Sequence, residues 1–292
     1  MKYESYDCPL GNLEGCATKP LSGRIRDFPE VGLKKCLECG ITSHDQDLRS
    51  NVDYSNGSMH EWKFMGDKEL DVPAEDTERR LNAIISLSKT HQIKSILDFG
   101  SGRGQMLRVL SGNFEVFGVE PEKMARLECQ ELGFKVYSDF TDVKSDGMNF
   151  QAVVMFHVIE HLYNPRKILK EINKALPVGG ILVIETPNAD DALLKLYENL
   201  NFANFTYWSH HPVLYTHYAL AEIVGLAGFK VIENIGVQRY SIDNHVHWLA
   251  KNAPGGHDIF KNLFSNITKE SYNQDLIKLK QNDTLWLIAQ KA

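Results

Sequence analysis

An apolar run that ends in an acid and continues into alternating glycines is the stretch of this sequence best suited to bind a ligand. Residues 95–99 form the run, with Asp98 as the acid. The glycines that follow are Gly100, Gly102 and Gly104. A strand that ends in such glycines lets the backbone approach a ligand, and the following helix presents free N–H groups. A second apolar strand ends about 20 residues on at Glu120, whose carboxylate can accept both hydroxyls of a ribose. These residues predict a nucleotide-type cofactor site.

The spacing of the glycines distinguishes between cofactor families. A dinucleotide fingerprint reads G-x-G-x-x-G, whereas here an acid leads G-x-G-x-G, so the last glycine comes one residue early. This D-x-G-x-G-x-G form resembles the first motif of class I S-adenosylmethionine-dependent methyltransferases. The resemblance covers most of residues 91–235 and implies an α/β, Rossmann-like fold with a seven-stranded sheet. The cofactor-binding residues that it implies are Asp98, Gly100, Ser101, Gly102, Gly104, Glu120, Pro121, Asp139, Phe140, Phe156 and His157.

Alternating strand and helix patterns must position these residues, and such alternation predicts a parallel sheet. A leader helix is expected after Pro73, with apolar residues at Leu81, Ile84 and Ile85. The predicted core strands are 95–99, 115–120, 134–138, 151–156 and 181–186, with helices at 104–110, 121–132 and 165–176. A helix at 219–226 and strands at 229–236 and 283–290 match the final antiparallel hairpin of the family. Residues 238–281 are then a helical insertion between those two strands, which we expect to act as an acceptor lid.

Four of the five cysteines lie in the first 60 residues, which are polar and rich in turns. The pair Cys36 and Cys39 has the C-x-x-C-G form that offers two thiolates to one tetrahedral zinc ion. Together with Cys8 and Cys16 they predict a widened zinc knuckle of structural role, with His44 as a possible replacement ligand. The alternative is a decayed knuckle with free thiols. The fifth cysteine, Cys129, lies on the apolar face of a helix and is expected to be a small buried side chain.

The segment after the fourth predicted strand carries a further chemical pattern. Read alone, His157-x-x-Glu160-His161 is the pattern of inverted zinc peptidases. No distal acidic ligand motif stands out downstream, so we disfavour the peptidase interpretation. The methyltransferase resemblance implies instead that Phe156 and His157 lie beside the methionine end of the cofactor. His161 is then either a catalytic base or a hydrogen-bonding group within the fold.

An aromatic and histidine-rich stretch at residues 207–217 falls at the carboxyl-end rim of the sheet, where ligands bind in open α/β sheets. Imidazoles titrate near neutral pH, so His210 and His211 are candidates for removing a proton from the acceptor. In the alternative interpretation they only stack and form hydrogen bonds within a loop. Trp248 and its neighbouring histidines, in the insertion, either bind the acceptor or shape the lid.

Composition and charge limit the acceptor. The net charge of −6 argues against nucleic acid as the main partner, since phosphate neutralisation needs a basic surface. Residues 155–158 read Met-Phe-His-Val where amino-methylating nucleic-acid enzymes carry an N-P-P-Y-type tetrapeptide. The expected acceptor is therefore a small molecule or glycan, and the resemblance favours a sugar hydroxyl within nucleotide-sugar or surface-polysaccharide pathways. Sugar C-methylation, ribosomal RNA methylation and a non-catalytic binding module are the alternatives, in that order.

The chain is expected to contain a cysteine-rich segment (1–60), a linker with the leader helix (61–90) and a methyltransferase core (91–292). Tyr54 and Trp62, in the aromatic-containing polar loop at residues 51–71, either cover the cofactor or acceptor, or pack the two parts together. No apolar run is long enough to span a bilayer, and the first residues lack the apolar core of a signal peptide. These features predict a cytoplasmic protein, as a monomer or homodimer.

Overall fold

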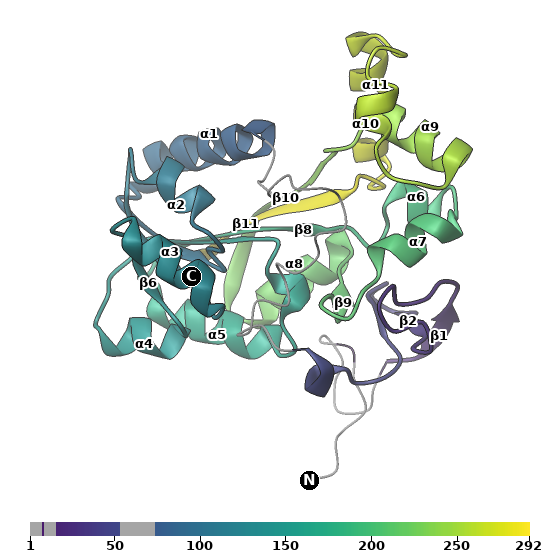
Figure 1. The fold of residues 1–292 in the computed structure, drawn as a ribbon. Coiled ribbons are helices and arrows are strands. Elements are labelled where there is room, and N and C mark those ends of the chain that lie inside the picture. Colours follow the sequence, from purple (N-terminus) through teal and green to yellow (C-terminus); the bar gives the residue numbers. More distant parts are fainter. Residues whose placement is uncertain (1–7, 9–15, 53–73) are drawn as a thin grey trace.

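The computed structural model describes residues 8, 16–52 and 74–292, and its main feature is a seven-stranded sheet (Figure 1). The strand order is β10-β11-β8-β7-β4-β5-β6, and all strands run in the same direction except β11, which is antiparallel to both β10 and β8. The strands are β4 (Ser95–Phe99), β5 (Glu115–Val119), β6 (Lys135–Tyr137), β7 (Ala152–Phe156), β8 (Ile181–Pro187), β10 (Phe229–Val237) and β11 (Thr284–Lys291). The predicted α/β fold with a seven-stranded sheet is confirmed. Tyr54 and Trp62 lie outside the described residues.

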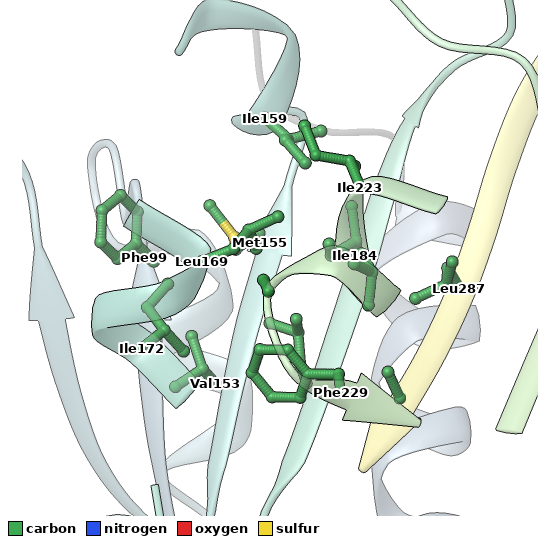
Figure 2. Packing of buried hydrophobic residues seen from close by; sticks show 14 of the residues in the cluster. Phe99, Val153, Met155, Ile159, Leu169, Ile172, Ile184, Ile223, Phe229 and Leu287 are labelled. Carbon is green, nitrogen blue, oxygen red and sulfur yellow. The ribbon is translucent and has the colours of Figure 1, made fainter. Parts of the chain in front are cut away.

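Helices cover both faces of this sheet because alternate residues of each strand point to opposite sides. On one face, Val153 and Met155 of β7 pack against α5 and α8 (Figure 2). On the other face, Val154 packs with residues of α1 and α2, among them Ile84. The helices of the core are α1 (Ala74–His91), α2 (Gln105–Leu110), α3 (Lys123–Glu131), α4 (Phe140–Ser145), α5 (Pro165–Ala175), α6 (Ala192–Lys195), α7 (Leu200–Thr206) and α8 (His217–Leu226).

A second sheet joins the cysteine-rich segment to the core. It has the strand order β1-β2-β3-β9, with every pair antiparallel. Its strands are β1 (Thr18–Leu21), β2 (Leu33–Cys36), β3 (Thr42–His44) and β9 (Val213–Leu214), and the 3-10 helix η1 (Arg49–Asn51) follows β3. Since β9 belongs to the histidine-rich stretch 207–217, here called the histidine rim, the cysteine-rich segment lies directly against that rim.

Three helices fill the insertion between β10 and β11, namely α9 (Ile242–Lys251), α10 (Gly256–Ile259) and α11 (Asn266–Lys278). Trp248 is 3% exposed, and its ring centroid lies 5.1 Å from that of Phe202 and 5.3 Å from that of Phe205 on α7. His245 and His247 are also buried. These side chains therefore shape the insertion and fix α9 on α7. Within the described part of the chain, no helix is both long enough and apolar enough to cross a membrane.

Candidate active site

The glycine turn after β4 leaves room for a ligand at one position. Gly100, Gly102 and Gly104 all have positive φ, at 84°, 51° and 78°. A Cβ atom on Gly100 would lie 2.4 Å from Cγ2 of Val158, and one on Gly104 would lie 2.8 Å from Sγ of Cys129. A Cβ on Gly102 would meet no described atom within 4 Å. Packing within the protein thus requires two of the glycines, whereas the space beside Gly102 is open to a cofactor.

Glu120 connects this turn to the end of β5. Its carboxylate accepts hydrogen bonds from the backbone N–H of Gly102 at 2.8 Å and of Glu122 at 2.8 Å. The side chain is 8% exposed, and burial raises its pKa. Each carboxylate oxygen has two lone pairs, so both can still accept a hydroxyl of a ribose. The sequence-predicted acid therefore lies against the open glycine of this turn.

Asp98 at the end of β4 and Ser101 in the turn are both buried. Asp98 is 3% exposed, and burial raises its pKa to about 7 while the charge of Arg80 opposes that rise. Ser101 is buried beside Gly118, where a Cβ atom would come within 2.7 Å of the serine Oγ. A bulkier residue than glycine at position 118 would therefore displace Ser101.

Three further cofactor-binding residues implied by the resemblance, Asp139, Phe140 and Pro121, take different positions. Asp139 is exposed and caps α4, accepting a 2.7 Å hydrogen bond from the backbone N–H of Thr141. Phe140 is 3% exposed and packs on Phe99 with ring centroids 5.9 Å apart. Pro121 is exposed next to Glu120. Phe140 therefore supports the end of β4 from within the core, while Asp139 and Pro121 face solvent.

His157, directly after β7, lies in a network of charged groups. Its Nδ1 is 3.3 Å from Oε1 of Glu160, and its Nε2 is 3.3 Å from Oε1 of Glu185. Burial disfavours the imidazolium, but these two carboxylates raise the pKa of His157 overall. Arg239 from the start of the insertion places Nη1 3.1 Å from Nε2 of His157. Neighbouring Phe156 stacks on Trp286 of β11, with ring centroids 5.9 Å apart.

Sequence reasoning missed the groups that hold this network. Arg80 is fully buried in α1 and donates to Glu185 Oε1 at 2.6 Å. Glu185 has no exposed surface, and its pKa is lowered by His157 and Arg80 even though burial acts to raise it. Two signals in the sequence pointed to these groups. Arg80 lies four residues before Ile84, on the apolar face of a predicted helix, and Glu185 is an acid inside an apolar strand.

The structure brings two of the three predicted base candidates together. The ring centroids of His161 and His211 lie 4.7 Å apart. Nδ1 of His161 lies 2.7 Å from the carbonyl oxygen of His210. Ligand atoms of Glu160, His161 and His211 lie within 4.8 Å of one another, and we call these three the acid–histidine group.

His210 takes a different environment from His211. Its ring stacks on Trp208 with centroids 4.5 Å apart, and the residue is 6% exposed. Burial and the neighbouring His161 lower the pKa of His210 to about 4, and the same two causes lower the pKa of His211 well below its usual value. Both imidazoles are therefore neutral at pH 7.

The four N-terminal cysteines gather in one place as free thiols. Ligand sulfurs of Cys8, Cys16 and Cys36 lie within 4.8 Å of one another, and Sγ of Cys39 lies 3.2 Å from Sγ of Cys8. His44 does not join them, because its Nε2 lies 3.1 Å from the carbonyl oxygen of Trp208. Three of these sulfurs are close enough to one another to share one ion, and the fourth, that of Cys39, contacts Cys8.

Comparison with known proteins agrees with this geometry. A family model described as a methyltransferase domain matches residues 74–234, which is more than half of the chain. An S-adenosylmethionine-dependent methyltransferase from Archaeoglobus fulgidus is similar in structure, with 21% identity over 74% of this chain and 94% of that one, and a TM-score of 0.52. The N-methyltransferase NodS from Bradyrhizobium japonicum, solved with S-adenosyl-L-homocysteine, shares 14% identity over 82% of this chain and 99% of that one, with a TM-score of 0.50.

None of the curated proteins matches the chain. The two structures share the fold with this chain, and the family model covers the glycine turn, Glu120 and the acid–histidine group. The chain therefore belongs to the methyltransferase-domain family and is an S-adenosylmethionine-dependent methyltransferase.

Proposed function

We propose that this enzyme methylates a hydroxyl group of a sugar, sugar nucleotide or glycan precursor. The observation that carries the proposal is the position of the neutral imidazoles next to the cofactor turn. Val158 packs against Gly100, and its carbonyl oxygen accepts a 3.0 Å hydrogen bond from the backbone N–H of His161. His211 lies beside His161. A group that can accept a proton is thus held close to the site where a methyl group is delivered.

The chemistry follows from these positions. S-adenosylmethionine supplies an activated methyl group, so that the acceptor oxygen forms a bond to carbon and the sulfur keeps the electron pair of the broken bond. A hydroxyl must lose its proton in this step, and a neutral imidazole is suited to accept it. His161 or His211 serves as that base in this proposal. The rest of the protein aligns the two reactants, which is the main contribution to such a displacement.

The polar surroundings fit an acceptor with several hydroxyl groups. Arg239 and Asp76, joined by a 2.7 Å ion pair, bring charged hydrogen-bonding groups to the side of His157. Sugar hydroxyls both donate and accept, so they can bind carboxylates and guanidinium groups alike. Because the chain is acidic, we propose a small molecule or glycan rather than a nucleic acid as the acceptor.

Calorimetric titration with S-adenosylmethionine is the first test, with Glu120→Gln compared with Glu122→Gln. Glu122 is equally buried and also holds backbone N–H groups, but those belong to the first turn of α3. We expect Glu120→Gln alone to weaken binding, by roughly 10- to 150-fold if one charged hydrogen bond is lost.

Screening sugar nucleotides for methylation then tests the acceptor. If the protein binds the cofactor but methylates none of these sugar nucleotides, the proposed sugar acceptor is excluded, whereas the assignment as a methyltransferase stands.

We also propose that Cys8, Cys16, Cys36 and Cys39 hold a structural zinc ion. Zinc–sulfur bonds of about 2.3 Å place two sulfurs of a tetrahedral site about 3.8 Å apart. The sulfurs of Cys8, Cys16 and Cys36 lie within 4.8 Å of one another and that of Cys39 lies 3.2 Å from that of Cys8, which is the scale of such a site. Four protein ligands leave no open coordination position, so this ion stabilises the segment and takes no part in catalysis. Free thiols of this kind suit a reducing compartment, and we propose a cytoplasmic location.

Zinc analysis of the purified protein tests this site. Cys36→Ser and Cys39→Ser should each lose one zinc ion per chain, and Cys129→Ser is the matched control because its thiol is buried away from the other four. Equal zinc content in all three variants and the wild type would refute the site.

A further inference from the structure

We propose that Glu160, His161 and His211 form a second metal site, which binds a divalent transition-metal ion at the end of the sheet where the acceptor lies. Two imidazoles and one carboxylate are a donor set that suits such ions, and three protein ligands leave coordination positions for other molecules. Ligand atoms of the three residues lie within 4.8 Å of one another. Glu160 is fully buried, whereas His161 and His211 are only half-buried, so the group opens towards the rim.

Two buried polar atoms in this group make no hydrogen bond within the described part of the chain. They are Oε1 of Glu160 and Nδ1 of His211. Oε1 of Glu160 lies 3.3 Å from Nδ1 of His157, while Oε2 accepts a 2.8 Å hydrogen bond from Thr186. A buried polar atom without a partner costs about 1–3 kcal/mol. A bound cation would satisfy the carboxylate oxygen and the imidazole nitrogen together.

The tautomer of His161 supports the same assignment. The carbonyl oxygen of His210 can only accept, so the 2.7 Å contact requires that Nδ1 of His161 carries the proton. Nε2 therefore carries the lone pair that a metal ion needs. A backbone carbonyl that fixes the ring in this way is the usual outer partner of a histidine ligand. Thr186 acts similarly on Glu160, because its hydroxyl donates to the carboxylate oxygen that does not face His157.

The ion would change the roles of the two histidines. With metal bound, His161 and His211 act as ligands, and the ion lowers the pKa of an acceptor hydroxyl that coordinates to it. The proton of that hydroxyl then leaves to solvent water, and the oxygen is ready for methylation. The inference rests on the proposed function only for the identity of this oxygen, since binding of the metal ion alone needs neither acceptor nor cofactor.

Titration with Zn²⁺ and Mn²⁺ as the only added ligands tests the site, using the full chain. Glu160→Gln, His161→Gln and His211→Gln should each lose one bound metal ion per chain, or bind it at least about 100-fold more weakly, because even outer partners of a ligand contribute about 10- to 100-fold. His210→Gln is the matched control, since its ring stacks on Trp208 and lies outside the group. Metal binding unchanged in all three ligand variants would overturn the proposal.

If the Glu160, His161 and His211 variants fail to fold, a second measurement tests the same site with these three residues intact. Cys36→Ser protein should still bind one Zn²⁺ ion at the acid–histidine group, and Cys36→Ser protein that binds none would refute the second site. S-adenosylmethionine titration of the wild type is run in parallel. If the wild type binds no S-adenosylmethionine, the proposed function fails even though the metal result stands, so the two failures are distinguishable.

Discussion

Replacement of Gly102 by alanine separates cofactor binding from folding. Gly102 has φ 51° and no described atom within 4 Å of the position of an added Cβ, so the new methyl group clashes with nothing in the protein. Gly147, after α4, offers a matched control with φ 63° and the same open surroundings. Both variants place an alanine in the left-handed region, but only Gly102 lies beside Glu120.

The Gly102→Ala substitution should change both the stability of the fold and the affinity for the cofactor, by amounts that can be worked out separately. Left-handed backbone costs an ordinary residue about 1–2 kcal/mol, so both variants should lose a similar amount of stability. For a chain of this size that loss lowers Tm by roughly 2–8 °C. In Gly102→Ala the methyl group also occupies the space proposed for the cofactor. If it displaces one hydroxyl from the Glu120 carboxylate, about 1.5–3 kcal/mol is lost, or roughly 10- to 150-fold in affinity.

Thermal unfolding and calorimetric titration with S-adenosylmethionine measure these two quantities. We expect the two variants to melt together and only Gly102→Ala to bind the cofactor weakly. Binding of wild-type affinity by Gly102→Ala would show that the open space at this glycine is not where the cofactor lies. Equal weakening in Gly147→Ala would show that the effect is one of general stability.

Three further changes test other parts of the structure. Arg80→Met leaves Glu185 buried with one fewer cation, and denaturant unfolding should show a loss of about 3–5 kcal/mol; a change below about 1 kcal/mol would contradict the buried pairing. Burial and nearby Asp283 raise the pKa of Asp191 to about 8, so the folded state holds a proton that the unfolded state has lost, and stability falls as pH rises towards 8. Asp191→Asn keeps the cap of α6 and should reduce that fall between pH 6 and pH 8 by about 2 kcal/mol, whereas an unchanged slope would refute the raised pKa. Gly100→Ala would bring a Cβ atom within 2.4 Å of Val158 and should lower Tm more than Gly102→Ala does, and equal melting of the two would be evidence against that contact.

Local patterns were sufficient to predict the core sheet. The strand Ser95–Phe99 was predicted with its observed bounds because a short apolar run before glycines has few other interpretations. The helix expected at 219–226 begins instead at His217, because the hydroxyl of Thr216 caps it by accepting from the backbone N–H of Ala219. The last strand, expected at 283–290, runs one residue later as Thr284–Lys291. Such shifts are small because periodicity fixes the interior of an element better than its ends.

Contacts between distant segments could not be predicted from local patterns. The two residues of β9 are too few to show any periodicity, so its pairing with β3 gave no signal in the sequence. His210 and His211 are neighbours of the same type, and only the folded loop shows that His211 meets His161 while His210 stacks on Trp208. Composition drew attention to the histidine rim as a group, but it could not give the direction of each side chain within it.

The pairing of β3 with β9 has a consequence for the order in which the protein can mature during synthesis. Thr42 pairs with Leu214, so about 170 residues must be translated before the N-terminal sheet is complete. At about 5–20 residues per second this takes roughly 10–35 s. All four clustered cysteines, in contrast, lie within the first 39 residues and emerge from the ribosome together. The segment that we propose to hold zinc is therefore synthesised long before the strand that joins it to the core.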